Sequence, residues 1–71
     1  MRASKYAMSE DMMRWKAARR SLRSAYYRHI YAHGLPISKA PGIEAKVSEL
    51  TPLPPKLQAA LSLVIETARR L

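Results

Sequence analysis

The sequence predicts an all-α fold, in which a long N-terminal helix, a short middle helix and a C-terminal helix form one small bundle. Apolar side chains recur every three or four residues in three separate segments, which is the period of a helix. No segment alternates with the period of two that a strand requires. Clusters of glycine and proline separate the three segments. We expect a single domain over residues 1–71, with helices over 9–33, 41–50 and 54–70 and a flexible end over 1–8.

The first helix has clear signals at both ends. Ser9 can cap it, because its hydroxyl can accept from the backbone N–H groups of a first turn. Gly34 suits the left-handed conformation that ends many helices, and Pro36 prevents the helix from resuming. One line of this helix is apolar and is expected to face the core. Its members are Met8, Met12, Trp15, Leu22, Tyr26 and Ile30.

The two later helices are predicted from shorter apolar patterns. In the middle segment Ile43, Val47 and Leu50 recur with spacings of four and three. In the last segment the spacings alternate between four and three, which predicts a packing seam. The members of this seam are Leu57, Leu61, Val64, Ala68 and Leu71. Ile65 lies beside the seam and makes the apolar face wider than one neighbouring helix would cover.

The small size of the chain predicts self-association. Domains this short bury a small core and usually gain stability from disulfides, a metal or oligomerisation. The chain has no cysteine, which excludes disulfides and fits a reducing cytoplasm, the location that we expect. We therefore predict a homodimer formed through the last helix and the apolar line of the first. The expected core and dimer residues are Met12, Trp15, Leu22, Tyr26, Ile30, Leu57, Leu61, Val64, Ile65, Ala68 and Leu71.

The net charge of +8 predicts an anionic partner. Thirteen basic residues face five acidic ones, and eight of the basic residues lie in the first 33 positions. Such a charge attracts nucleic acid, an anionic membrane or an acidic protein surface. No apolar run approaches the roughly 20 residues that span a bilayer, so no transmembrane segment is expected. A helix lying in the membrane surface is a further alternative, which Glu10, Asp11 and the wide polar sector disfavour.

The sequence carries no pattern that predicts catalysis, a cofactor or a metal site. Two glycines are too few for a phosphate-binding loop. His29 and His33 lie four positions apart on one helix face and could both reach a metal ion. A zinc site needs at least three protein ligands, and no third one lies nearby in the sequence. We therefore expect a non-enzymatic protein.

A basic and tyrosine-rich side of the first helix is the strongest functional signal. The residues expected to bind a partner are Arg14, Lys16, Arg19, Arg20, Arg23, Tyr27, Arg28 and Tyr31. Arginine and the aromatic residues dominate the hot spots of protein interfaces. This mixture favours a protein partner with an acidic or mixed surface, which the chain would regulate as an adaptor or inhibitor. Nucleic acid is the alternative partner, because the same cations could contact its phosphates.

Overall fold

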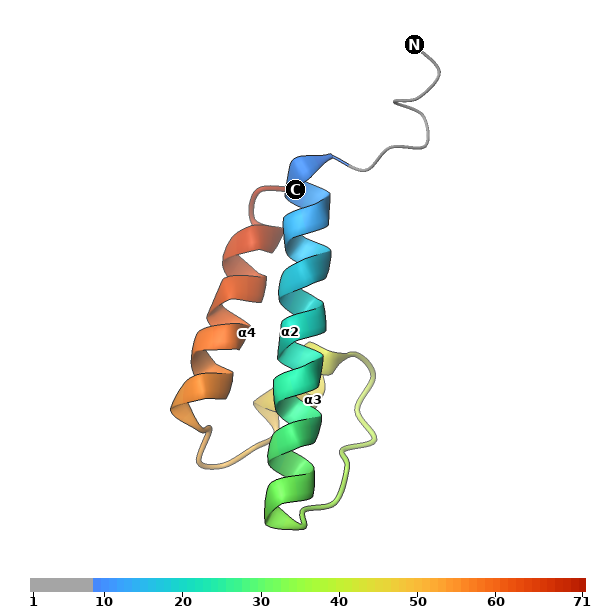
Figure 1. Cartoon of the computed structure of the whole chain (residues 1–71), viewed down its shortest axis with the longest axis vertical. Coiled ribbons are helices and arrows are strands. Elements are labelled where there is room, and N and C mark those ends of the chain that lie inside the picture. The colour runs from blue at the N-terminus through green and yellow to red at the C-terminus, as the bar shows by residue number, and fades with distance from the viewer. Residues whose placement is uncertain (1–8) are drawn as a thin grey trace.

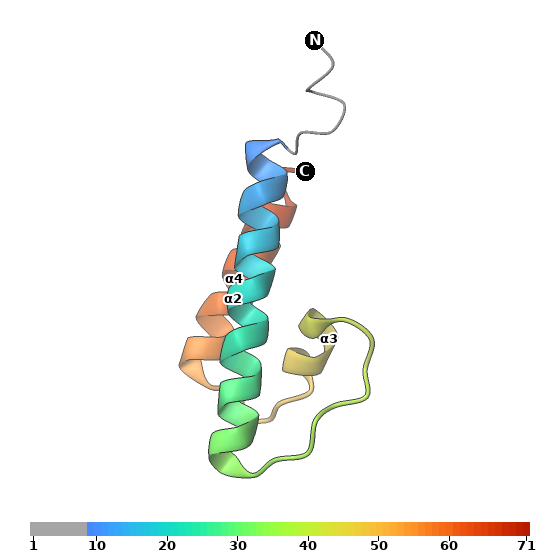
Figure 2. The same ribbon diagram turned by 45° about the vertical axis from the view of Figure 1, so that its right-hand side comes forward.

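The computed structural model describes residues 9–71, and that part of the chain contains three helices and no strand. These are α2 (Glu10–His33), α3 (Ile43–Ser48) and α4 (Pro55–Ala68). Helices α2 and α4 lie side by side and run antiparallel, while the short α3 lies beside the pair (Figures 1 and 2). The predicted all-α bundle is confirmed at this level. None of these helices is both long and apolar enough to cross a membrane.

Helix α2 begins and ends at the predicted signals. The Ser9 Oγ atom accepts a hydrogen bond from the Met12 N–H at 3.1 Å, which confirms the N-cap. At the other end Gly34 has φ 63° and ψ 33°, the left-handed conformation that glycine adopts without steric cost. The Leu35 N–H then donates to the Ile30 carbonyl at 3.0 Å and closes the helix. The predicted flexible end over residues 1–8, Met8 included, lies outside the described residues.

Helices α3 and α4 are shorter than the spacing of their apolar residues predicts. Helix α3 begins only at Ile43, because Gly42 has φ 82° and is not helical. It ends at Ser48, where the next N–H group bonds three residues back rather than four. Helix α4 begins after Pro54, whose extended conformation is the one that a following proline favours. Arg70 lies beyond the helix end, and its N–H donates to the Thr67 carbonyl at 3.2 Å in a tighter turn.

The core lies where all three helices meet. Its buried residues are Ala18, Leu22, Tyr26, Ile30, Ile43, Val47, Leu57 and Val64. They define a covered half of the molecule, which comprises α2 from Ala18 to Ile30, α3, and α4 from Pro55 to Val64. The open half comprises the remaining N-terminal part of α2 and the C-terminal part of α4. Neither part of the open half contains a fully buried residue among those described.

The predicted core residues divide between these two halves. Five of them are buried: Leu22, Tyr26, Ile30, Leu57 and Val64. Met12, Trp15 and Leu61 are half-buried, whereas Ile65, Ala68 and Leu71 are exposed. The last three therefore do not belong to the core of a single chain, because α3 packs against only the covered half. Because they are exposed, they remain accessible for the dimer that the sequence predicts.

Hydrogen bonds fix the connector between α2 and α3 in place. The hydroxyl of the buried Tyr26 accepts from the Ser38 N–H at 3.0 Å. The Ser38 hydroxyl donates to Glu49 at 2.6 Å and accepts from the Ala40 N–H at 3.0 Å. The Lys46 ammonium donates to the Ala40 carbonyl at 2.5 Å and to the Ser38 carbonyl at 3.3 Å. The connector is thus tied both to α2 and to the end of α3.

Candidate binding surface

Four cationic side chains of α2 line one shallow hollow of about 220 Å³ on the molecular surface. They are Lys16, Arg19, Arg20 and Arg23. Their spacing of three or four positions places them on neighbouring turns of one helix side. Lys16, Arg20 and Arg23 are exposed, whereas Arg19 is half-buried. The structure therefore brings together four of the six cations that the sequence predicts to bind a partner.

Arg19 has a structural contact that the sequence does not predict. Its Nε atom donates to Glu44 Oε2 at 2.7 Å, and its Nη2 atom donates to Glu44 Oε1 at 3.2 Å. Its guanidinium carbon also lies 5.1 Å from the centroid of the Trp15 ring, within the range of a cation–π contact. Because Glu44 belongs to α3, this two-point contact fastens α3 to α2. Arg19 thus has a charge partner within the chain.

The Glu44 carboxylate remains ionised beside the cations. Its partial burial raises the pKa, but the hydrogen bonds from Arg19 and from its own backbone, together with the charges of Arg19 and Arg23, outweigh this effect and lower the pKa of Glu44. One anion therefore faces four cations around this hollow. The hollow keeps a net positive charge at neutral pH, and Lys16, Arg20 and Arg23 supply it.

Arg14 and Arg28 lie apart from the four-cation hollow. The Arg14 guanidinium contacts Glu10 at 2.9 Å and Asp11 at 3.9 Å within the first turns of α2. Arg28 donates to the Ser24 hydroxyl at 3.4 Å and borders a different hollow, between α2 and the start of α4. The structure does not join these two predicted partner-binding residues to the cluster.

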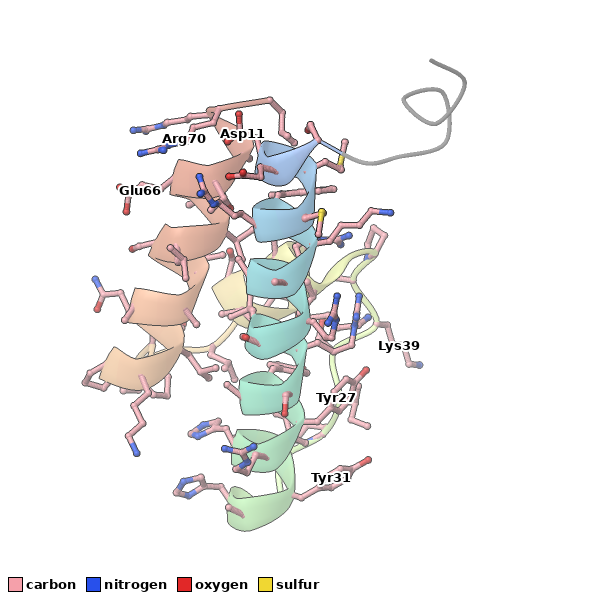
Figure 3. All side chains as sticks on the ribbon, turned by 45° about the horizontal axis from the view of Figure 1, so that its top comes forward. Asp11, Tyr27, Tyr31, Lys39, Glu66 and Arg70 are labelled. Carbon is pink, nitrogen blue, oxygen red and sulfur yellow. The ribbon has the colours of Figure 1, made fainter. Side chains whose placement is uncertain are left out.

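Two tyrosines continue the cationic side toward the C-terminal end of α2. The Tyr27 and Tyr31 rings stack with their centroids 6.2 Å apart and an interplanar angle of 29°. Tyr27 also meets the buried Tyr26 edge to face at 5.2 Å. In Figure 3, Tyr27 and Tyr31 extend on the side of α2 that faces away from α4, and Lys39 of the connector lies on that same side. Tyr31 is 73% exposed, so most of its ring is available for contact.

We call this surface the basic-tyrosine face, formed by Lys16, Arg20, Arg23, Tyr27, Tyr31 and Lys39. Sequence reasoning did not include Lys39, because its position depends on the hydrogen bond between Ser38 and Tyr26. No local pattern signals that connection. The other members share a face simply because helical spacing puts them there.

The two histidines that share one face of the first helix, for which no metal site was predicted, are adjacent in the structure. The His29 and His33 rings lie with their centroids 4.5 Å apart. Among residues 9–71, no third histidine or acidic side chain joins them to form a set that could hold a metal ion. The pair contributes its imidazole rings to a hollow beside residues 50–55.

The basic-tyrosine face presents chemistry suited to holding an anionic surface. A guanidinium group can donate two parallel hydrogen bonds to a carboxylate or a phosphate. The phenol rings add apolar contact area. The face is carried by a helix whose two ends are capped, so its side chains are presented on a rigid support. Comparison with protein-family models, curated proteins and solved structures finds no match to this chain.

Proposed function

We propose that this protein is a non-enzymatic regulator that binds a larger protein through the basic-tyrosine face, as an adaptor or inhibitor. The observation that supports the proposal best is the juxtaposition of three exposed cations with a stacked tyrosine pair on one helix, in which Tyr27 is half-buried and Tyr31 is exposed. The partner would offer carboxylates to Arg20 and Arg23 and an apolar contact to Tyr27 and Tyr31. Its surface is therefore acidic or mixed.

The apolar content of this side favours a protein over a polyanion. Met13 is 54% exposed and Tyr31 73% exposed. With Arg20 and Tyr27 they are spaced by seven, seven and four positions, which keeps them on one side of α2. Removing such apolar surface from water favours association with a protein, whereas contact with phosphates alone would leave Met13 in water. Arginine and tyrosine are also the residue types that dominate protein hot spots.

Nucleic acid is the second candidate, and the stacked tyrosines favour it specifically. Exposed aromatic rings beside cations form platforms on which bases of a single strand can stack. Four cations, Lys16, Arg20, Arg23 and Lys39, would neutralise about four phosphates. The logarithm of the binding constant for a duplex would then fall with the logarithm of salt concentration with a slope of about −3.6.

Affinity capture from a host lysate, with and without nuclease, separates the two candidates. We expect a stoichiometric protein that survives nuclease treatment and is lost with the Arg20→Glu/Arg23→Glu double variant. The matched control is Arg69→Glu/Arg70→Glu, which makes the same change of charge at the exposed end of α4 and should retain the partner. Capture that is unaffected by Arg20→Glu/Arg23→Glu would mean that the wrong face has been chosen.

The nucleic-acid candidate has its own test. The Trp15 fluorescence can be followed while duplex or single-stranded nucleic acid is added at several salt concentrations. Tight binding that weakens with a slope of about −3.6 for a duplex, or about −2.8 for a single strand, would favour nucleic acid as the partner. Absence of binding at low salt would remove that candidate.

We further propose that two copies associate through the apolar surface of the open half. Its residues are Met12, Trp15, Ile65 and Ala68, together with the half-buried Leu61 at the edge of the covered half and Leu71 beyond the end of α4. Ile65 is 46% exposed and Leu71 55% exposed, so a single chain leaves about half of each in water. A second copy would cover them and add apolar burial to a small domain.

Analytical ultracentrifugation over a dilution series tests the dimer. We expect Ile65→Glu to give a monomer where the wild type is dimeric. Leu63→Glu is the matched control, because Leu63 is 50% exposed and lies about 200° away around the same helix. A wild-type chain that is monomeric at every concentration would contradict the proposal.

A further inference from the structure

A groove runs between the C-terminal half of α2 and the residues that lead into α4. It consists of two neighbouring hollows of about 490 and 550 Å³. His29, Pro54 and Pro55 line both of them, so the two hollows are continuous. We call this surface the proline groove. It borders Arg28 but includes no member of the basic-tyrosine face.

The groove has an apolar and rigid lining. Ala25 and Ala32 lie two turns apart on α2, and their short side chains leave space above the buried Leu57. Pro54 and Pro55 form the facing wall. Proline fixes its own φ and has no backbone N–H, so this wall presents ring carbons in one conformation. A ligand that enters the groove therefore orders little of the protein, which reduces the entropic cost of binding.

The charges at the rim of the groove are all basic. Arg28 borders the first hollow from α2, and Lys56 borders it from α4. His33 borders the second hollow, and no acidic side chain lines either one. An apolar floor between two cations complements an apolar side chain that is flanked by carboxylates.

We propose that the proline groove binds a short, extended acidic segment of another protein. One apolar side chain of this segment lies over Ala25 and Ala32, and carboxylates on either side of it bind Arg28 and Lys56. The distance along α2 from Ala25 to His33 is about 12 Å at ~1.5 Å per residue. An extended chain covers that distance with about four residues at ~3.3 Å each.

The groove and the basic-tyrosine face lie on different sides of the molecule. Ala32 and Tyr27 are five positions apart, or about 140° around α2. Tyr27 extends away from α4 in Figure 3, whereas the groove is closed on one side by the start of α4. Both surfaces can therefore be occupied at once. This inference goes beyond the proposed function, since it gives the protein a second and independent contact.

The test uses the full chain labelled with ¹⁵N and the blocked peptide Glu-Phe-Glu-Leu-Glu as the probe. Two-dimensional amide spectra should show shifts confined to Ala25, Ala32 and the start of α4. Lys56→Glu should weaken binding by at least about tenfold, because it removes one charge-assisted hydrogen bond and places a carboxylate beside those of the peptide. Arg69→Glu is the matched control, because Arg69 is exposed and belongs neither to the groove nor to the basic-tyrosine face, and it should leave the affinity unchanged.

Filling the groove provides a second variant. Ala32 is exposed, so Ala32→Gln should leave the fold intact while occupying the space that the apolar side chain needs. Ala17→Gln makes the same exchange at another exposed position of α2 and should bind like the wild type. Each variant is checked for an unchanged helical content.

Several outcomes would overturn the proposal. If Lys-Phe-Lys-Leu-Lys bound as tightly as Glu-Phe-Glu-Leu-Glu, the charges at the rim would not contribute to binding. If Glu-Ser-Glu-Ser-Glu bound as tightly, the apolar floor would not contribute. Shifts centred on Arg20 and Arg23, or no shifts at millimolar peptide, would also contradict it. If the same amide shifts appeared when the protein was concentrated without peptide, the groove would be occupied by a second copy of the chain and not by another protein.

Discussion

The covered half and the open half contain similar apolar residues, yet these residues differ in how far folding buries them. In the covered half Leu22 and Val47 are completely buried, and Ile30 keeps 1% of its surface exposed. In the open half Ile65 and Leu71 keep 46% and 55%. α3 and the connector lie beside the lower part of the α2–α4 pair and add neighbours there (Figure 2). Ile65 also lies about 80° around α4 from the buried Leu57, so it does not face α2 in the same way. Two helices alone cannot surround a side chain that three can.

This contrast separates the part of α2 that folding buries from the part whose apolar side chains stay partly exposed. Complete burial of a large apolar side chain is worth roughly 1.5–3 kcal/mol, so the covered half holds the chain together. The open half contributes less to folding of a single chain and offers apolar surface to a second one. Helix α2 carries both parts, and the cations Lys16 and Arg20 lie near the boundary between them. Burial of Leu22 and Tyr26 thus holds in place the same part of α2 that carries Arg20, Arg23 and Tyr27.

Matched substitutions in the two halves test the comparison most strongly. Ile30→Ala should lower the free energy of unfolding by about 2–5 kcal/mol, because it opens a cavity in a filled core. Ile65→Ala should lower it by less than about 1 kcal/mol at high dilution, since Ile65 is already 46% exposed. Urea unfolding followed by circular dichroism measures both.

The total stability of a domain this small is expected to be only about 4–10 kcal/mol, so Ile30→Ala could unfold it. Ile30→Val, with an expected loss of about 0.5–1.5 kcal/mol, then provides the measurement. Equal losses for Ile30→Ala and Ile65→Ala would contradict the division into halves. A loss for Ile65→Ala that grows with protein concentration would instead mark Ile65 as a dimer contact.

The sequence predicted the helices well because their signals are local. Ser9, Gly34 and the spacing of apolar residues act within one or two turns. The division into halves could not be predicted in the same way. Leu57 and Ile65 lie about 80° apart on the wide apolar side of α4, and the first is buried whereas the second is 46% exposed. Which part of this wide apolar side is covered depends on where α2 and α3 lie, and therefore on contacts between distant segments.

For the candidate site, too, the sequence predicts what lies on one helix but not the contacts between distant segments. The line from Lys16 to Tyr27 was predictable, because residues on one helix keep their relative positions. The pairing of Arg14 with Glu10 was also accessible to sequence reasoning, since oppositely charged residues four positions apart commonly pair. The contact between Arg19 and Glu44 could not be predicted from the sequence, because the two residues are 25 positions apart. Lys39 reaches the face through the connector, which again requires the tertiary structure.

A smaller effect is expected from the hydrogen bond that holds the connector. Tyr26→Phe keeps the ring in the core but leaves the Ser38 N–H without the hydroxyl that it contacts at 3.0 Å. We expect a loss of about 0.5–1.5 kcal/mol and faster hydrogen exchange of the Ser38 amide. Tyr31→Phe is the control, because the Tyr31 ring is 73% exposed. If both variants unfolded alike, the connector would not depend on this hydrogen bond.

The smallest effect concerns the ion pair that fastens α3 to α2. Because the folded state lowers the pKa of Glu44, the pair stabilises the protein above the pKa of the unfolded carboxyl, about 4.3, and this contribution is lost as the pH falls through the folded pKa. The side chains of Arg19 and Glu44 are 28% and 36% exposed, so solvent screening keeps the contribution below about 1 kcal/mol.

The measurement is the free energy of unfolding between about pH 6 and pH 3. The wild type should lose more stability over this interval than Glu44→Gln, which has no carboxyl to protonate. Glu66→Gln, an exposed exchange on α4, should follow the wild type. Parallel curves for the wild type and Glu44→Gln would mean that the pair contributes nothing to folding. Arg19 would then be available to a partner, and the basic-tyrosine face would gain one cation between Lys16 and Arg20.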